Sequence, residues 1–573
     1  MSSTTDNAGH GIGPAKGLGA VLDYACASHR RAALVLIVLA MLSFLPGFFQ
    51  IPPVDRDEAR FAQATKQMVE SGNYVDIRFQ NEVRYKKPVG IYWLQAAVVK
   101  TADALGMPDA DTTIWLYRIP SLLGATGAVL LTYWCALAFV PRRAALLAAM
   151  MMASSILLGV EARLAKTDAV LLFTIVAAMG AMARVYLAER RAPGSATNWT
   201  WPAIFWTAVS GGILIKGPLI LMVAGLAAVT LAICDRNARW MKAMRPLPGV
   251  LWMILLVLPW FVAIVARSGN SFFAQSLGHD MFDKVISGQE AHGAPPGYYF
   301  LLFWVTFWPG AVLAGLAAPA VWKARRESGT RFLLAWLVPS WIVFEAVMTK
   351  LPHYVLPLYP AIAILIAGAL DKDSLVRGHW LTKGTVGWFL FPVAIGIGGV
   401  VMSIVIGSDL NILAWPFAAA ALILGLFAWR LYDADGAERA LARGIVASVL
   451  IAFAVYGVIF PSLPALFPAP LIAEQIAATD CKKPHVASAG YEEPSLVFLL
   501  GTDTRFSDGA GAAEFLRQKP CRFALIDAHN ERSFVQRADA VALRYDRVGS
   551  VEGYNVSIGR PVAISIFRSA AAP

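Results

Sequence analysis

The chain of 573 residues is poor in charge and in cysteine. Only 15% of its residues are charged, which together with 57% hydrophobic residues and a mean hydropathy of +0.58 excludes a soluble globular protein. Its 5 cysteines form no CxxC pair or His/Cys cluster, so nothing in the sequence indicates a structural metal. No small-residue cleavage site follows the first apolar stretch, which therefore reads as a retained membrane helix.

Thirteen apolar stretches long enough to cross a bilayer occupy most of the first 460 residues. The fifth is interrupted by Gly211-Gly212 and by Lys216-Gly217-Pro218, breaks that are tolerated where protein or a cavity satisfies the freed backbone. The sequence therefore predicts a polytopic α-helical membrane protein with about 13 transmembrane helices. The expected spans are 32–50, 118–140, 143–161, 169–188, 201–215, 218–234, 248–267, 298–322, 332–349, 354–370, 385–407, 412–430 and 444–463.

Basic residues in short loops mark the cytoplasmic side of a membrane protein. Pairs such as Arg142/Arg143 and Arg325/Arg326 fall in every second gap, and Arg30/Arg31 precede the first span. We therefore expect a cytoplasmic N-terminus, and an odd number of crossings places the tail outside. The net charge of +11 fits such loops together with sites for anionic lipids or phosphates, so membrane lipids are expected partners and nucleic acid is not.

The first outer loop, 51–117, is predicted to hold two interfacial helices, Asp57 to Glu70 and Pro88 to Ala104, because each has an amphipathic rhythm. A short hairpin or loop is expected between them. We divide the chain into a cytoplasmic segment at 1–31, a transmembrane domain at 32–463 and a periplasmic domain at 464–573.

The tail after about Pro464 alternates helical segments (471–478, 511–518) with short apolar strands (485–489, 522–526, 541–548, 562–567). This pattern predicts a small α/β domain, without a glycine-rich phosphate fingerprint or a nucleophile elbow. Cys481 and Cys521 lie in it. An extracytoplasmic location would allow a disulfide between them, and two unpaired thiols are the alternative.

Reactive side chains gather in four gaps that are all assigned to the outer side. This convergence predicts one active site there, in which carboxylates accept a proton from an attacking hydroxyl while Lys and Arg hold a phosphate leaving group. Group transfer from a lipid phosphate is the reaction that such a set favours. The four gaps contain Asp55, Asp57, Glu58, Arg60, Arg84, Lys86 and Lys87; Glu161, Arg163, Lys166 and Asp168; His279, Asp280, Asp283, Lys284, Glu290 and His292; and Lys350, His353 and Tyr354.

Each of these groups also has a structural interpretation. Asp57 and Glu58 would favour the N-terminal dipole of the loop helix, and Lys86 and Lys87 would anchor lipid head groups. Asp168 begins a membrane span, where an ionised side chain is costly unless it is used or paired, although a role as helix cap is the alternative. His279 in a loop would simply be solvated.

The segments Asp57-Glu58-Ala59-Arg60-Phe61-Ala62, Gly72-Asn73-Tyr74 and Tyr85-Lys86-Lys87-Pro88-Val89-Gly90-Ile91-Tyr92-Trp93-Leu94 resemble the first periplasmic loop of the polyprenyl-phosphate-dependent type C glycosyltransferases. This superfamily includes the protein O-mannosyltransferases and, closest to this chain, the bacterial 4-amino-4-deoxy-L-arabinose lipid A transferases. The resemblance extends to Asp168, to Lys350-Leu-Pro-His-Tyr354 and to the number of spans. One difference is Lys86-Lys87-Pro88, where the aminoarabinose transferases often have Glu-Lys-Pro.

The resemblance implies a role for individual residues. Asp57 matches the family acid placed at the acceptor hydroxyl, Asp168 a second acid, and Lys87 the lysine that contacts the donor phosphate. It implies no cofactor that the reaction must have, and leaves a divalent metal open with no ligands assigned. The full set is Asp57, Asp168 and Glu58 as catalytic residues; Lys87, Arg60 and Lys284 at the donor phosphate; and Lys86, His279, His353 and Tyr354 in the substrate cavity.

We therefore expect a multi-pass enzyme of the bacterial inner membrane whose active site faces the periplasm. Its predicted reaction is inverting transfer from an undecaprenyl-phosphate-linked monosaccharide, aminoarabinose-like or a hexose, to lipid A or another envelope glycolipid. A protein O-mannosyltransferase-like enzyme is the alternative. A lipid-linked sugar flippase is disfavoured, because few ionisable residues lie within the spans, and a structural or receptor role leaves the reactive loops unexplained.

Overall fold

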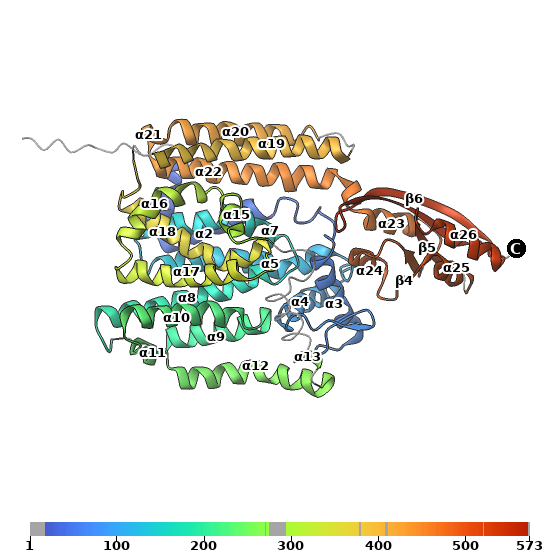
Figure 1. Cartoon of the computed structure of the whole chain (residues 1–573), viewed down its shortest axis with the longest axis horizontal. Coiled ribbons are helices and arrows are strands. Elements are labelled where there is room, and N and C mark those ends of the chain that lie inside the picture. Colours follow the sequence, from blue (N-terminus) through green and yellow to red (C-terminus); the bar gives the residue numbers. More distant parts are fainter. Residues whose placement is uncertain are drawn as a thin grey trace, which may run out of the picture.

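The computed structural model describes residues 18–195, 198–269, 271–273, 294–377, 380–406, 411–518 and 521–570. Most of these residues form a bundle of helices whose long axes run side by side, and the carboxyl-terminal α/β unit sits at one end of the bundle (Figure 1). The helices of the first loop, α3 and α4, lie at that same end. The predicted His279 and Lys284, with the other reactive residues of loop 268–297, lie outside the described residues.

The first half of the bundle contains α1 (Leu18–Cys26), α2 (His29–Phe44), α5 (Ile114–Ala136), α6 (Arg142–Ser154), α7 (Ile156–Ala162), α8 (Asp168–Arg191), α9 (Thr200–Lys216), α10 (Leu219–Asp235), α11 (Trp240–Ala243), α12 (Pro246–Ser268) and α13 (Ser271–Phe273). The second half contains α15 (Tyr298–Thr306), α16 (Ala311–Lys323), α17 (Ser328–Ala346), η3 (Pro352–Leu358), α18 (Tyr359–Asp371), η4 (Trp380–Val386), α19 (Gly387–Ile406), α20 (Ala414–Arg430), α21 (Tyr432–Asp435), α22 (Ala437–Ala452), η5 (Phe453–Ile459) and η6 (Phe460–Ser462).

Among the described residues, 6 helices are long and apolar enough to cross a membrane, or up to 8 if two bent pairs each count as one span. Every predicted stretch overlaps one of the helices above, but two stretches differ from a straight span. Stretch 143–161 is divided into α6 and α7 at a bend of 60°, and stretch 298–322 into α15 and α16 at 120°. Pro309 lies in the second break and has no N–H to continue the helical ladder. The number of thirteen crossings stays a prediction.

Packing separates central from peripheral helices. The α8 helix and the η3–α18 segment are buried along most of their length, whereas α12 exposes most of its apolar surface. Glycines allow close contact with α8: a Cβ at Gly124 of α5 would lie 2.9 Å from the Val170 backbone. Because α8 lies at the centre of the bundle, its first residue, Asp168, is buried.

The first loop contains α3 (Asp57–Ser71), α4 (Gly90–Ala104) and, between them, the antiparallel pair β1 (Arg78–Phe79) and β2 (Glu82–Val83). Arg56, the residue before the first turn of α3, has an unusual backbone conformation. Its φ of +65° and ψ of −100° are costly for any residue other than glycine. Arg56 is held there by donating from Nη2 to the Ser557 carbonyl at 2.6 Å. The carboxyl-terminal unit therefore helps to fix the start of α3, where Asp57 lies.

The carboxyl-terminal unit is a five-stranded mixed sheet with strand order β4-β3-β5-β7-β6. Strands β3, β4 and β5 are parallel, while β5–β7 and β6–β7 pair antiparallel. The small sheet that the sequence predicts at this end is present. Its elements are η7 (Pro464–Leu466), α23 (Pro468–Ala477), β3 (His485–Ala489), α24 (Pro494–Leu500), β4 (Arg505–Phe506), α25 (Gly509–Arg517), β5 (Arg522–Asp527), α26 (Glu531–Ala540), β6 (Tyr545–Asn555) and β7 (Arg560–Ser569).

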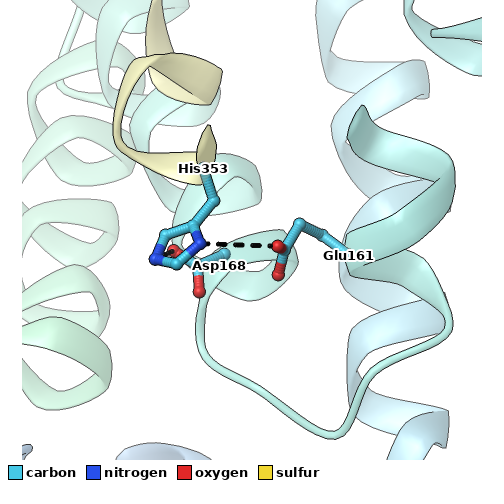
Figure 2. Close-up of side chains that lie close together, drawn as sticks. All are labelled: Glu161, Asp168 and His353. Carbon is cyan, nitrogen blue, oxygen red and sulfur yellow. Dashed lines mark ion pairs between the residues drawn. The ribbon is translucent and has the colours of Figure 1, made fainter. Parts of the chain in front are cut away.

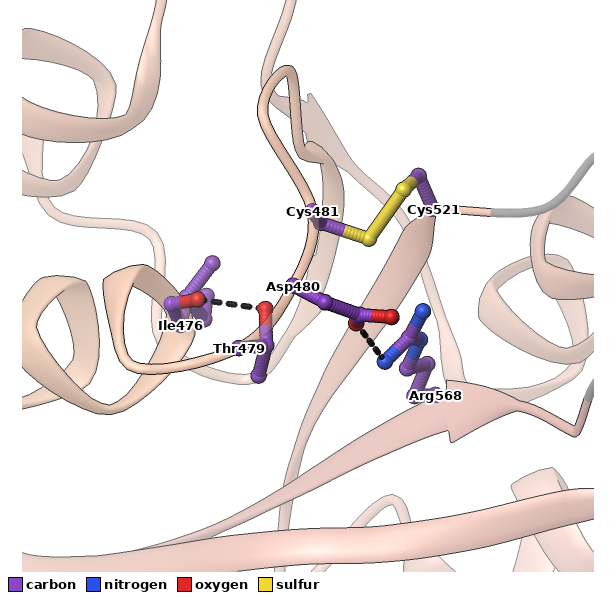
Figure 3. The surroundings of a disulfide bond; sticks show 6 residues. All are labelled: Ile476, Thr479, Asp480, Cys481, Cys521 and Arg568. Carbon is purple, nitrogen blue, oxygen red and sulfur yellow. Dashed lines mark hydrogen bonds and ion pairs between the residues drawn. A yellow bond between two sulfur atoms is a disulfide. The ribbon is translucent and has the colours of Figure 1, made fainter.

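Cys481 and Cys521 form a disulfide that ties the segment after α23 to the start of β5 (Figure 3). Their Cα atoms are 5.6 Å apart across a sequence separation of 40 residues. An ion pair between Arg568 and Asp480, 2.6 Å long, joins β7 to the same segment. Of the two states that the sequence left open for these cysteines, the structure has the disulfide.

Candidate active site

A cluster of buried ionisable side chains lies at the end of the bundle that faces α3 and α4. Glu161 comes from α7, Asp168 from the first turn of α8 and His353 from η3, and Figure 2 shows the imidazole with both carboxylates close to it. The His353 Nδ1 atom lies 3.6 Å from Glu161 Oε1, and Nε2 lies 3.8 Å from Asp168 Oδ1. Residues far apart in sequence therefore converge on one site.

Two lysines balance the negative charge of this cluster. Lys166 Nζ lies 3.2 Å from Glu161 Oε1, and Lys216, the last residue of α9, forms a short ion pair with Asp168 Oδ1. Burial alone would lower the pKa of Lys166, but the charges of Glu161, Asp168 and Asp57 raise it above its usual value. The ammonium group is thus held in its charged form by the carboxylates that it neutralises.

Asp57 is exposed at the first position of α3, so its carboxylate is accessible from outside the bundle. It acts electrostatically on Lys166, which lies in the loop that joins α7 to α8. The structure therefore places the predicted acid near Lys166, at the edge of the buried cluster.

Glu58, the neighbour of Asp57, has a different environment. Its carboxylate is buried and receives two hydrogen bonds from the Arg118 guanidinium, at 2.8 and 2.9 Å. The backbone N–H groups of Val54 and Ala165 donate to it at 2.9 and 2.8 Å. Both oxygens are thus occupied in joining α3 to α5 and to the loop before α8. This geometry suits a residue that positions Asp57 and Lys166.

Lys87 and Tyr354, two further predicted residues, lie by the cluster. Lys87 acts electrostatically on His353. The Tyr354 ring centroid lies 5.2 Å from that of His353 and 5.5 Å from Lys216 Nζ. Arg60 and Lys86, by contrast, line a cleft between the first loop and the carboxyl-terminal unit. The predicted site residues thus form an inner group and an outer group.

Two residues of the site are not predicted from the sequence. Lys216 belongs there only to a break in a span, although a basic residue beside Gly217-Pro218 within an apolar stretch is a signal for a functional position. Arg118 sits at the start of an apolar stretch and carried no local signal. Its five donors go to Glu58 and to the carbonyls of Phe48, Ile51 and Pro52.

Glu161, Asp168 and His353 each offer one atom that can bind a metal, and these atoms lie within 4.8 Å of one another. Glu161 Oε2 is buried without a hydrogen-bond partner among the described residues, so it also has ligand capacity. Glu161 Oε1 and Asp168 Oδ1 already bind Lys166 and Lys216. A divalent cation would therefore compete with two ammonium groups, and the charge balance of the cluster does not depend on one.

A family model described as dolichyl-phosphate-mannose-protein mannosyltransferase matches residues 34–270. An undecaprenyl phosphate-α-4-amino-4-deoxy-L-arabinose arabinosyl transferase from Edwardsiella ictaluri is 27% identical over 418 residues, which cover 70% of this chain and 70% of that protein. A relative of the same description from Pseudomonas fluorescens is 28% identical over 363 residues, 61% of each chain.

Two crystal structures share the fold. ArnT from Cupriavidus metallidurans in the apo state has a TM-score of 0.71 at 18% identity, covering 94% of this chain and 98% of that one. The same protein bound to undecaprenyl phosphate gives 0.70 at 19% identity, covering 93% and 97%. The resemblance of this chain to the polyprenyl-phosphate-dependent type C glycosyltransferases, predicted from its first loop, is therefore confirmed.

Proposed function

We propose that the chain transfers a monosaccharide from undecaprenyl phosphate to a periplasmic glycolipid, with an aminoarabinose-like sugar and lipid A as substrates. The single observation that carries this proposal is the accessible Asp57 beside a buried, lysine-neutralised cluster at one end of a membrane bundle. The names of the sequence relatives and the undecaprenyl phosphate bound in a structure of the same fold support the choice of donor.

The reaction is a single displacement. The acceptor hydroxyl attacks the anomeric carbon opposite the lipid phosphate, the new C–O bond forms, and the bond to the phosphate breaks with its electron pair on the phosphate oxygen. Asp57 accepts the proton of the attacking hydroxyl. The configuration at the anomeric carbon inverts, through a transition state with oxocarbenium character.

The lysines supply the charge stabilisation. A phosphate leaving group needs no dedicated general acid, because cations stabilise the negative charge that it gains. Lys87 contacts the donor phosphate, while Lys166 and Lys216 keep the buried cluster neutral and its carboxylates fixed. Asp168 positions Lys216 and His353 near that phosphate. Glu58 and Arg118 hold the start of α3.

The location follows from the same assignment. We place the cytoplasmic segment at 1–31, the transmembrane domain at 32–463 and the carboxyl-terminal unit, 464–573, in the periplasm of a Gram-negative bacterium. The disulfide between Cys481 and Cys521 supports an oxidising compartment for that unit. The active site then faces the periplasm, where lipid A is accessible.

Mass spectrometry of lipid A and envelope glycans tests the proposal. We expect a deletion strain to lose a pentosamine mass from lipid A and a strain complemented with the wild-type chain to regain it. Complementation with Asp57→Asn should fail although the variant accumulates in the membrane. Loss of a sugar from envelope protein in place of lipid A would favour the mannosyltransferase-like alternative.

A further inference from the structure

The turn that joins β6 to β7, residues 556–559, carries two apolar side chains on its surface. Val556 and Ile558 are each 60% exposed. Turns are usually built from small or polar residues, so a Val and an Ile in one four-residue turn are unusual. Single exposed apolar residues are common on protein surfaces, however, and the position of the turn therefore decides what these two side chains contact.

Hydrogen bonds fix the shape of this turn. The Asn555 side-chain oxygen accepts from the backbone N–H of Ser557 at 2.9 Å and from that of Ile558 at 3.3 Å. Gly559 donates its N–H to the Asn555 carbonyl at 2.9 Å, and the Tyr554 hydroxyl donates to the Gly559 carbonyl at 2.7 Å. The two apolar side chains are thus presented by a preformed turn, so little conformational entropy remains to be lost when they bind.

The turn lies where the chain leaves the helical bundle. Arg56, which follows the first expected span, donates from Nη2 to the Ser557 carbonyl at 2.6 Å. Ala465 follows the last expected span, and its carbonyl oxygen would lie 2.7 Å from a Cβ at Gly553 of β6. Figure 1 shows β6 and β7 running from this end of the bundle outward to the carboxyl terminus, so the turn is at their inner end.

Other side chains at these exits are typical of a membrane surface. Phe49, after α2, is 52% exposed, and its ring packs edge-on against Trp115 in the first turn of α5, with the centroids 5.3 Å apart. Aromatic residues collect at the level of the lipid head groups. Arg560, the first residue of β7, is exposed beside the apolar turn and can bind a lipid phosphate.

We propose that this turn is a membrane anchor: Val556 and Ile558 insert into the lipid leaflet at this end of the bundle, and Arg560 lies among the lipid phosphates. Apolar side chains next to a cation are the composition of an interfacial anchor. The inference requires only that the bundle spans a membrane, and it holds whichever sugar or acceptor is used. Since the same turn holds Arg56, the residue before Asp57, the anchor also sets the height of Asp57 above the lipid.

Spin labels measure this depth directly. The full-length protein is labelled with a nitroxide at Val556→Cys or at Ile558→Cys and placed in nanodiscs of phosphatidylethanolamine and phosphatidylglycerol. The disulfide stays intact, and the free cysteines are removed by Cys26→Ser, Cys135→Ala and Cys234→Ser. Because oxygen concentrates in lipid and a nickel chelate stays in water, we expect both labels to collide more often with oxygen than with nickel.

Val535→Cys is the matched control. Val535 is a 37% exposed valine of the same carboxyl-terminal unit, on α26, which lies far from the bundle in Figure 1. A label there should collide readily with the nickel chelate. Labels at 556 and 558 with the same nickel accessibility as the label at 535 would overturn the proposal, and so would labels shielded from both reagents, which would indicate contact with protein.

A charge in the turn gives an independent test. With the label at 556, Ile558→Asp should shift the oxygen-to-nickel ratio toward that of the 535 label, because an ionised carboxylate is costly in lipid. Ile558→Leu should leave the ratio unchanged. An equal ratio in the two variants would contradict insertion of Ile558. Neither measurement requires sugar transfer, so failure of the proposed function would leave this test intact.

Discussion

At the scale of the residue, Asp57 and Glu58 are neighbours with opposite surroundings. Asp57 is exposed, whereas four hydrogen bonds occupy the carboxylate of Glu58. We predict that Asp57→Asn lowers transfer by about 10²–10⁴-fold, because an amide does not accept the hydroxyl proton. The variant should keep the thermal midpoint of the wild type. Asp103→Asn, an exposed acid on α4, is the control, and equal activity of the two variants would remove Asp57 from the reaction.

Glu58→Gln should fail in a different way. It leaves Arg118 buried without its counter-charge, and breaking a buried pair costs about 3–5 kcal/mol. We therefore expect a lower thermal midpoint together with any loss of transfer, measured on detergent-solubilised protein. Glu82→Gln, an exposed residue of the hairpin, should leave the midpoint unchanged. A Glu58→Gln protein of normal stability but without activity would point to direct chemistry at Glu58.

Lys87 provides the corresponding prediction for the donor. Lys87→Ala should weaken use of the donor by about tenfold to a hundredfold and leave the KM for the acceptor nearly unchanged, because a charge-assisted contact to phosphate is lost. Lys87→Arg should retain part of the activity, since charge remains while geometry changes. Lys100→Ala on α4 serves as the control. The measurement is a steady-state assay at varied donor concentration. If Lys87→Ala has the same donor dependence as the wild type, Lys87 does not contact the donor phosphate.

At the scale of the element, α24 joins the carboxyl-terminal unit to α3. Ser495 donates its backbone N–H to Asp55 at 2.9 Å, and Lys66 donates to the Phe498 carbonyl at 3.1 Å. Burial raises the pKa of Asp55 to about 6, an effect that Glu493 increases and that Ser495 and Arg60 oppose. The Asp55 carboxyl therefore binds its proton more tightly in the folded state than in the unfolded state. Asp55 thus favours the folded state most at low pH.

We predict that stability falls as the pH rises from about 4 through 6, by on the order of 2 kcal/mol from Asp55 alone. Thermal midpoints measured across this range should show the decrease in the wild type and a smaller one in Asp55→Asn. Asp103→Asn should retain the full dependence. A midpoint of Asp55→Asn that follows the wild type at every pH would contradict this account of the junction.

Local signals predicted many of these elements. The loop helices expected at 57–70 and 88–104 are α3 and α4, and the strand expected at 485–489 is β3, because their amphipathic or apolar patterns are contained within each segment. The strand expected from 541 begins at Tyr545, since α26 extends to Ala540. The helix α24 is not among the predicted elements, although Pro494 in its first turn and Gly501 at its carboxyl end are local helix signals.

The sequence predicts less of the site than of the fold. It indicates Asp168, because an ionised carboxylate at the start of an apolar span is costly unless it is paired or used. Its partner Lys216 is 48 residues away, and the contact arises only when α8 and α9 pack together. The same holds for Glu58 and Arg118, 60 residues apart. Pairing between distant segments is set by tertiary packing, which local periodicity does not encode.

At the scale of the whole molecule, α3, α4 and the carboxyl-terminal unit lie at one end of the bundle (Figure 1), and the loop that carries Lys166 is joined to α3 through the Ala165–Glu58 hydrogen bond. We predict that this end faces the periplasm. A reporter that works only in the periplasm should be active when fused after Val458, and one that works only in the cytoplasm when fused after Arg326. A cytoplasmic signal after Val458 would reverse the assignment of every outer loop.

The direct measurement is transfer by the purified protein from undecaprenyl-phosphate aminoarabinose to lipid A, followed by mass spectrometry of the acceptor. We predict that lipid A gains one aminoarabinose with the wild-type chain, and that the gain falls by at least about a hundredfold with Asp57→Asn while Asp103→Asn matches the wild type. An unmodified acceptor with the folded, donor-binding wild-type protein, or equal product from Asp57→Asn, would contradict it.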